Sequence, residues 1–150
     1  MLKICFACSK GGHYSQMKRL IKKIDEIDGL KESETFFLTF SRGNPEQNEY
    51  CVEDPERNPL KVIKTFFQTI KILSKEKPDV IISTGAGVAI PACYIGRLFG
   101  SKIIFIESYS RVTKPSLSGR LAKPISNLFF VQWPQLKGKY KNSIYAGRLR

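Results

Sequence analysis

Residues 2–13, LKICFACSKGGH, decide the fold of this chain. The apolar run predicts a strand over 3–8, and Gly11-Gly12 predicts a tight turn after it. Apolar residues then recur at helical spacing, which predicts an amphipathic helix over 14–27. A strand-to-helix turn of this kind leaves backbone N–H groups uncovered at the positive end of a helix dipole, where phosphate binds well. The same turn carries the only histidine, His13, so the first hypothesis is a sugar-phosphate or nucleotide-type ligand.

The same alternation of strand and helix continues along the chain. Continuous apolar strands separated by helices predict an α/β fold, Rossmann-like, with a mostly parallel sheet covered on both faces. Right-handed crossovers place every strand-to-helix loop at the carboxyl edge of such a sheet, where ligands bind. The loops at 11–13, 84–87, 107–108 and 132–133 are therefore expected to converge. Further strands are predicted at 34–40, 50–52, 79–83, 103–107 and, last, 128–131, and helices at 59–75, 88–99 and 116–122.

Length and composition predict a single domain over 1–150 with a substantial core, because 42% of the residues are hydrophobic. No apolar run approaches the ~18 residues that cross a bilayer, and no signal peptide is recognised. A cytosolic or peripheral protein is expected. The Cys5-x-x-Cys8 spacing lies within a strand and has no second pair, so the four cysteines are interpreted as core residues and no metal is expected.

The formal charge of +12 is unevenly distributed along the chain. Residues 1–75 contribute +3 and residues 76–150 contribute +9, and no acidic residue follows Glu107. Such a stretch indicates an anionic partner, although a merely solvated basic surface is the alternative. Nucleic acid is not expected as that partner, because the basic residues are not interleaved with stackable aromatics.

Two side chains are candidates for chemistry at the predicted edge. His13 begins a helix, where the neutral form is favoured, so it can act as a base, donate a hydrogen bond to a phosphate, or simply cap its helix. Glu107 ends an apolar strand and needs a partner, for which Arg111 is the obvious candidate. Structural ion pairing and ligand binding are both open for this carboxylate. Neither a GxGxxG fingerprint nor a Walker loop is present.

Five motifs occur in order over nearly the whole chain, and as a set they resemble a known family. The set is similar to the non-donor subunit of split N-acetylglucosaminyltransferases that build lipid-linked oligosaccharide, and to bacterial counterparts in exopolysaccharide and capsule synthesis. It is more distantly similar to the N-terminal half of the GT-B enzyme that adds N-acetylglucosamine to the peptidoglycan lipid precursor. The motifs are Ser9–His13, Ser83–Gly87 followed by Pro91, Glu107–Arg111, Pro115–Gly119 and Val131–Pro134.

The resemblance implies one half of an inverting GT-B glycosyltransferase, inactive or nearly so alone, with no cofactor of its own. A separate donor-binding subunit would hold the UDP-sugar, and this chain would hold a lipid-linked sugar acceptor with a polyprenyl diphosphate. It implies a peripheral location on an anionic membrane surface at the cytoplasmic face. Eukaryotic members usually carry an N-terminal anchor, whereas this sequence starts at the strand, so attachment by surface helices is expected. The basic faces of the helices at 14–27 and 59–75 suit this role, although packing on the sheet with a solvated outer face is the alternative. Residues 144–148 resemble the point where a GT-B N-terminal domain passes into its linker.

The implied site combines two catalytic candidates with a set that would bind the acceptor and its phosphates. His13 is the candidate base or phosphate donor, with Glu107 as its rival. A non-catalytic membrane scaffold that recruits and activates a separate transferase is the alternative function. The acceptor and phosphate candidates are Ser9, Gly11, Gly12, Thr84, Gly85, Ala86, Gly87, Ser108, Arg111, Ser116, Gly119, Arg120 and Gln132.

Overall fold

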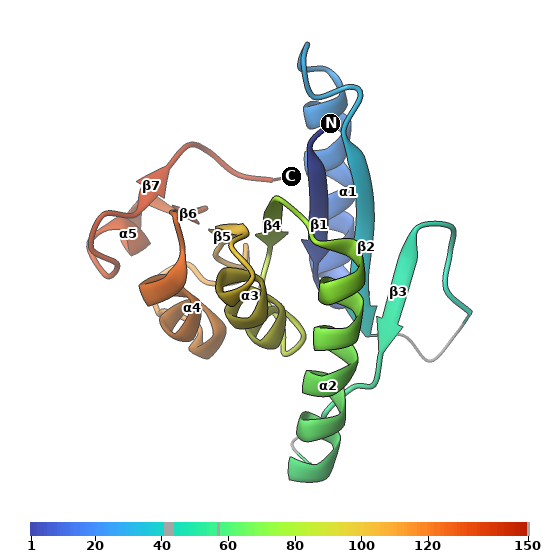
Figure 1. Ribbon diagram of the computed structural model, residues 1–150. Helices are drawn as coiled ribbons and strands as arrows, with labels where there is room; N and C mark the ends of the chain where they lie inside the picture. The colour runs from blue at the N-terminus through green and yellow to red at the C-terminus, as the bar shows by residue number, and fades with distance from the viewer. Residues whose placement is uncertain (41–43, 57, 150) are drawn as a thin grey trace.

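A computed structural model describes residues 1–40, 44–56 and 58–149. Its seven described strands form one sheet in the order β3-β2-β1-β4-β5-β6-β7, and every neighbouring pair is parallel (Figure 1). The α/β, Rossmann-like prediction is confirmed. The strands are β1 Lys3–Ala7, β2 Glu34–Phe40, β3 Glu49–Val52, β4 Val80–Ser83, β5 Lys102–Ile106, β6 Leu128–Val131 and β7 Ile144–Tyr145.

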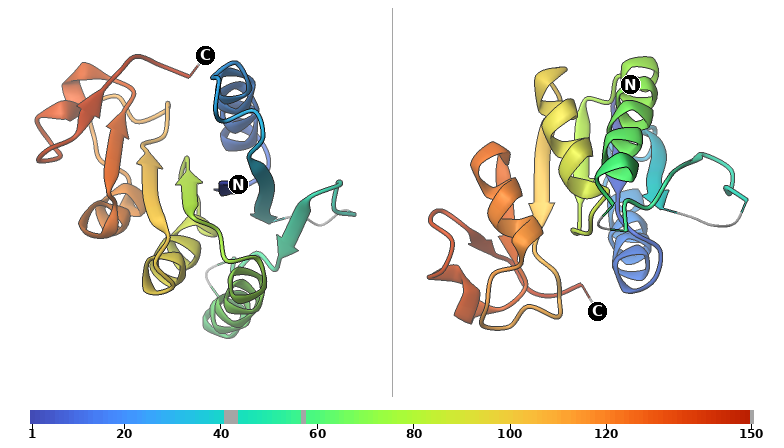
Figure 2. Two further views of the ribbon diagram at one scale, coloured as in Figure 1. Left: turned by 45° about the horizontal axis from the view of Figure 1, so that its top comes forward. Right: turned by 90° about the horizontal axis from the view of Figure 1, so that it is seen from below.

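Helices cover the two faces of the sheet unequally (Figure 2). One face is covered by α1, Gly12–Asp25, and the other by a row of α2, α3 and α4. No helix among the described residues is both long and apolar enough to cross a membrane. The remaining helical elements are α2 Pro59–Glu76, α3 Ala89–Leu98, α4 Leu117–Ala122, the 3-10 turn Lys123–Ile125 and α5 Pro134–Lys137.

Most predicted elements are confirmed, and the error lies at the end of the chain. β6 is not the last strand, because α5 and β7 follow it. β7 has only two residues, too few to show an alternating pattern, so its place beside β6 is visible only in the fold. Helix α2 begins as predicted: Asn58 caps it by accepting a hydrogen bond from the backbone N–H of Leu60, with Pro59 at the first position.

The cysteines lie where core packing predicts. Cys5, Cys8 and Cys93 are buried and Cys51 is half-buried, all as free thiols. Burial raises the pKa of Cys8 and that of Cys93 to about 12. Thiols of this kind are unreactive core residues.

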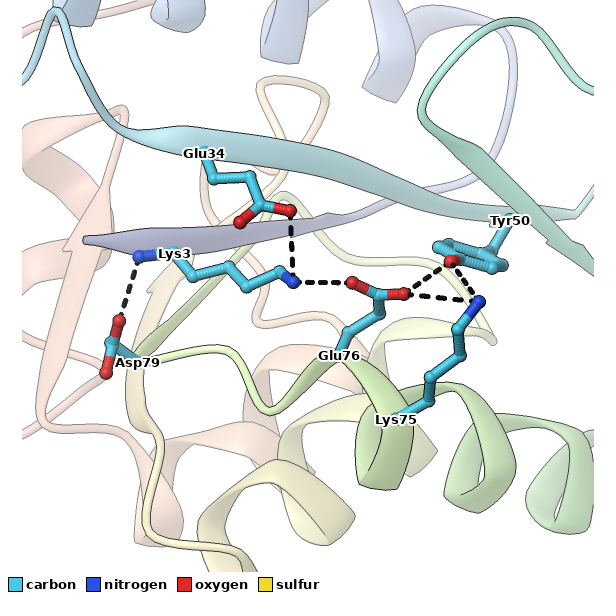
Figure 3. Close-up of polar contacts among 6 residues, drawn as sticks. All are labelled: Lys3, Glu34, Tyr50, Lys75, Glu76 and Asp79. Carbon is cyan, nitrogen blue, oxygen red and sulfur yellow. Dashed lines mark hydrogen bonds and ion pairs between the residues drawn. The ribbon is translucent and has the colours of Figure 1, made fainter. Parts of the chain in front are cut away.

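The amino edge of the sheet is closed by a polar network (Figure 3). The ammonium of Lys3 lies 2.6 Å from a carboxylate oxygen of Glu76 and 3.0 Å from one of Glu34. The Tyr50 hydroxyl donates to Glu76 at 2.5 Å, and Asp79 accepts from the backbone N–H of Lys3 at 2.8 Å. The network joins β1, β2, β3 and α2 at the edge opposite the glycine loops, so it supports the fold rather than the site.

The face that carries α1 is incompletely covered. An apolar groove of about 450 Å³ runs over the middle strands between α1 and the C-terminal segment 146–149. Parallel sheets are normally buried on both faces, so this groove is unusual for its position. We call it the α1-face groove; its lining includes Ile4, Leu20, Ile24, Val80, Ile82, Ile104, Ile106, Phe130 and Leu149.

Candidate functional site

The two glycine loops meet at the carboxyl edge, as predicted. The Thr84 hydroxyl donates to the carbonyl of His13 at 3.4 Å. The His13 ring lies against Gly85, where an added Cβ would come within 3.5 Å of His13 Cε1. Because Gly85 has φ +102° and Gly11 has φ +107°, both loops use a backbone conformation that favours glycine. The loop after β1 and the loop after β4 therefore form adjoining walls of one site.

Among the described residues, His13 is the one candidate with a buried side-chain polar atom that has no partner. Its Nδ1 is buried and has no hydrogen-bond partner among the described residues. Burial lowers the pKa of His13 below 6.5, and this outweighs the opposing effects of the Thr84 backbone and the Glu107 charge. The ring is therefore neutral at physiological pH, which is the form that can accept a proton.

The glycine–histidine loop is held from behind by Glu49. The Glu49 side chain is 1% exposed and lies 3.2 Å from the Lys10 ammonium. It also accepts hydrogen bonds from the Thr39 hydroxyl and from the backbone N–H of Glu46, each at 2.8 Å. These donors together hold the Glu49 pKa below 4.5 despite burial. Lys10 is thus engaged with Glu49 of β3.

Glu107 has partners other than the one predicted. The expected ion pair with Arg111 does not form, because Arg111 is exposed while the Glu107 carboxylate is buried. The carboxylate accepts from the Ser108 N–H at 2.9 Å, from the Ser116 N–H at 3.1 Å, from the Ser116 hydroxyl at 2.7 Å and from the Tyr140 hydroxyl. These bonds fasten both ends of the 108–116 loop to β5.

The position of α4 depends on this carboxylate. A Cβ at Gly119 would collide with Glu107 Oε2 and the Tyr140 hydroxyl oxygen, so only glycine fits there. Ser116 caps α4 by accepting from the Gly119 N–H at 2.8 Å. The predicted site residues Ser108, Ser116 and Gly119 therefore lie together around Glu107, where their polar contacts are internal.

Gln132 is likewise committed to internal contacts. Its amide donates to the Glu107 carbonyl and to Gln16 Oε1, each at 3.0 Å, and accepts from the Leu149 N–H at 2.9 Å. Gln132 thereby joins the carboxyl ends of β5 and β6 to α1 and to the C-terminal segment. The predicted convergence of the 107–108 and 132–133 loops is therefore found, and both lie beside α1.

Several contacts at this edge were not predicted from the sequence. The Trp133 indole donates to the Tyr109 carbonyl at 2.7 Å, and the Arg148 guanidinium stacks 3.9 Å from the Trp133 ring. A small cleft beside α1 is lined by Arg19 and Tyr109, among others. The one signal available for Arg19 was its helical spacing from Gly12, which puts both on one face of α1.

The two predicted anion-binding cations, Arg111 and Arg120, are exposed, as is Lys114 between them. No ion pair to any of these three occurs within the described part of the chain. Arg111 and Lys114 lie within the loop that Glu107 fastens, and Arg120 follows it on α4. The carboxyl edge therefore combines backbone amides, a neutral histidine and unpaired cations, a set that suits an anionic ligand with a hydroxyl to deprotonate.

Residues 52–149 match the model of the family described as "Oligosaccharide biosynthesis protein Alg14 like". The chain belongs to this Alg14-like family. It is 33% identical to the UDP-N-acetylglucosamine transferase subunit ALG14 of Candida albicans, over 93% of this chain and 74% of that protein. It is 28% identical to the Mus musculus protein of the same name, over 99% of this chain and 83% of that one. The expected relation to a split N-acetylglucosaminyltransferase is confirmed at this level.

Two solved structures superimpose on this chain and identify its fold. Acinetobacter baumannii MurG superimposes with a TM-score of 0.71 at 16% identity, over 99% of this chain and 44% of that one. A UDP-N-acetylglucosamine 2-epimerase from Rickettsia bellii gives 0.76 at 13% identity, over 99% and 45%. The GT-B-type fold is thereby shown, and this chain spans less than half of the length of these structures.

Proposed function

We propose that this Alg14-like chain is the acceptor-binding, membrane-associating subunit of a glycosyltransferase that moves a sugar from a UDP-sugar to a polyprenyl-diphosphate-linked acceptor. The observation that carries the proposal is His13, whose unpartnered Nδ1 lies where the two glycine loops meet. Among pathways, the motifs favour bacterial exopolysaccharide and capsule synthesis.

The chemistry that these residues support is an inverting transfer. Neutral His13 takes the proton from the attacking acceptor hydroxyl, the hydroxyl oxygen forms the new bond to the anomeric carbon, and the bond to UDP breaks with its electron pair leaving on UDP. The amides of Gly11, Gly12 and Gly85–Gly87 would bind the acceptor diphosphate, and Arg111 and Arg120 would attract it. Glu107 is the less favoured base, because its oxygens already accept hydrogen bonds from Ser108, Ser116 and Tyr140.

A second subunit would supply the donor half. The relatives are named as subunits of a transferase, and the GT-B structures that superimpose are more than twice as long. The α1-face groove offers the partner an apolar surface to cover, with Lys23 and Arg148 at its lining and no acidic side chain among the lining residues. A partner segment that is apolar on one side and acidic at its rim fits this surface.

The proposed acceptor requires the protein to work at a membrane, because a polyprenyl chain resides in the bilayer. The net charge of +12 would attract the chain to an anionic surface, and peripheral attachment at the cytoplasmic face is the arrangement we propose.

An assay of sugar transfer from UDP-N-acetylglucosamine to a polyprenyl-diphosphate sugar tests the proposal. We expect transfer only when this chain and a donor-binding subunit are both present. Full transfer by this chain alone would contradict the split site. Full transfer by the partner alone on a water-soluble acceptor would favour the scaffold alternative.

A further inference from the structure

One end of α2 carries an apolar cluster that no other element covers. Helix α2 starts at the carboxyl edge, and its first turns project beyond the sheet (Figure 1). There Leu60 is 77% exposed and Phe67 is 64% exposed. We call this cluster the α2 tip. It consists of Leu60, Val62, Ile63, Phe66 and Phe67, all of them exposed.

The α2 tip is separate from the stripe by which α2 packs on the core. The buried residues of the helix are Thr65, Thr69 and Leu73. Within the tip, positions 60, 63 and 67 share one side of the helix, and 62 and 66 lie beside them. A clustered apolar surface of this kind marks an interaction site rather than chance exposure.

The shape of the tip favours a soft partner. Apolar side chains cover more than one side of a protruding helix end, so the surface is convex. A rigid protein would need a cavity of matching shape, whereas lipid acyl chains adapt to such a projection.

The lysines beside the tip are already neutralised. The Lys61 ammonium lies 2.7 Å from a Glu56 carboxylate oxygen, and the Lys64 ammonium 2.5 Å from one of Glu53. Further positive charge lies in the acid-free stretch after Glu107, where no ion pair occurs within the described part of the chain. The acid-free basic stretch would therefore attract the protein to an anionic membrane from a distance, whereas the α2 tip would make the apolar contact with it.

We propose that the α2 tip inserts into the interfacial layer of an anionic bilayer, with apolar contact retaining the protein and the overall positive charge bringing it there. This inference rests on the proposed function, in which the acceptor is lipid-linked, and names the surface that meets the lipid. The expected attachment through the helix at 59–75 is thus assigned to the apolar side chains of its first turns.

Flotation with vesicles of phosphatidylcholine and phosphatidylglycerol tests the inference. The tip variant is Leu60→Ser with Phe67→Ser. The matched control is Leu98→Ser with Phe99→Ser, because Leu98 is 82% exposed on α3 at the opposite edge. We expect the tip variant to lower the vesicle partition coefficient about tenfold or more, with the control unchanged. Binding of the wild type, once formed, should largely persist from ~0.1 M to ~1 M salt, where charge attraction is screened.

Other outcomes would overturn the inference. These are wild-type protein that does not float, equal losses in both double variants, no loss in the tip variant, or binding that disappears at high salt. As a second measurement, Phe67→Trp should give blue-shifted emission that brominated lipid quenches, and unquenched emission would also contradict insertion.

The activity assay separates this inference from the proposed function. With a water-soluble, short-chain acceptor, the tip variant and its partner should turn over at the wild-type rate. Loss of vesicle binding with this activity retained supports insertion, whereas wild-type binding without any transferase activity refutes the proposed function alone.

Discussion

His13 is kept neutral by burial against Gly85, and this is the residue-scale property on which the proposed chemistry depends. Because the pKa is lowered from 6.5, the ring should remain unprotonated until the pH falls below that value. Since the chain has one histidine, its imidazole signals in NMR titration are unambiguous. A midpoint above 6.5 would contradict the structure.

Replacing His13 tests its role directly. We expect His13→Ala to lower the turnover of the assembled transferase about 10²-fold or more, the usual contribution of a positioned base. His13→Gln should fall similarly, because an amide can hydrogen-bond but cannot take the proton. Wild-type turnover in His13→Ala would remove the residue from catalysis.

Glu107 should matter chiefly for stability. Glu107→Gln puts an NH₂ donor in place of one carboxylate oxygen, and each of these oxygens accepts from two donors, so we expect a loss of about 2–4 kcal/mol in the free energy of unfolding. Gly119→Ala should be comparably destabilising, because its Cβ collides with Glu107 and Tyr140. Urea unfolding measures both, with Ser118→Ala beside them on α4 as the control. An unfolding free energy for Glu107→Gln equal to that of the wild type would contradict this assignment.

At this scale the sequence predicted which residues stand at the edge but not what they bond to. Glu107 was recognised as a carboxylate ending an apolar strand, and its natural partner within a few residues was Arg111. The actual donor Tyr140 is 33 residues away and reaches Glu107 only because β6 and α5 bring it back. Local spacing carries no information about such a partner.

At the scale of elements, the network of Figure 3 joins three strands to the end of α2. Contacts with Lys3 and Tyr50 lower the pKa of Glu76 below 4.5. Its contribution to stability is therefore present above 4.5 and is lost as the pH falls through the folded-state pKa. The pKa of Lys3 is raised above 10.5 by Glu76 and Glu34, so its contribution is present below 10.5 and is lost at higher pH.

Glu76→Gln should consequently lower the free energy of unfolding at neutral pH by about 1–2 kcal/mol and flatten its decline in acid. Chemical unfolding at several pH values measures this, with the exposed Glu32→Gln as the control. An acid decline as steep as that of the wild type would show that other carboxylates dominate.

Helices and strands were predictable from the sequence where their apolar pattern extends over many residues. Helix α2 has a cap, a proline at its first position and a periodic apolar stripe, so both ends were nearly right. β7 was missed because two residues contain no period, and the strand exists only through its pairing with β6. The apolar residues of α2 also divide into buried and exposed sets that the sequence pattern merges.

At the scale of the molecule, the α1-face groove should control assembly. Ile24 lines it, whereas Ile27 is exposed just beyond the helix and does not. We expect Ile24→Asp to abolish co-purification with a co-expressed donor-binding subunit, and Ile27→Asp to leave it intact, with circular dichroism confirming that both fold. Equal co-purification of the two variants would place the interface elsewhere.

The sequence by itself determined the strand–helix alternation, the parallel sheet and the edge at which the glycine loops meet. These follow from periodicity, turn residues and crossover handedness, which are properties of neighbouring residues. Only the tertiary structure decided that His13 Nδ1 is unpartnered, that Glu107 is fully bonded, and that the groove and the α2 tip are uncovered. Burial and hydrogen-bond satisfaction depend on which distant segments come together, and no local pattern specifies that.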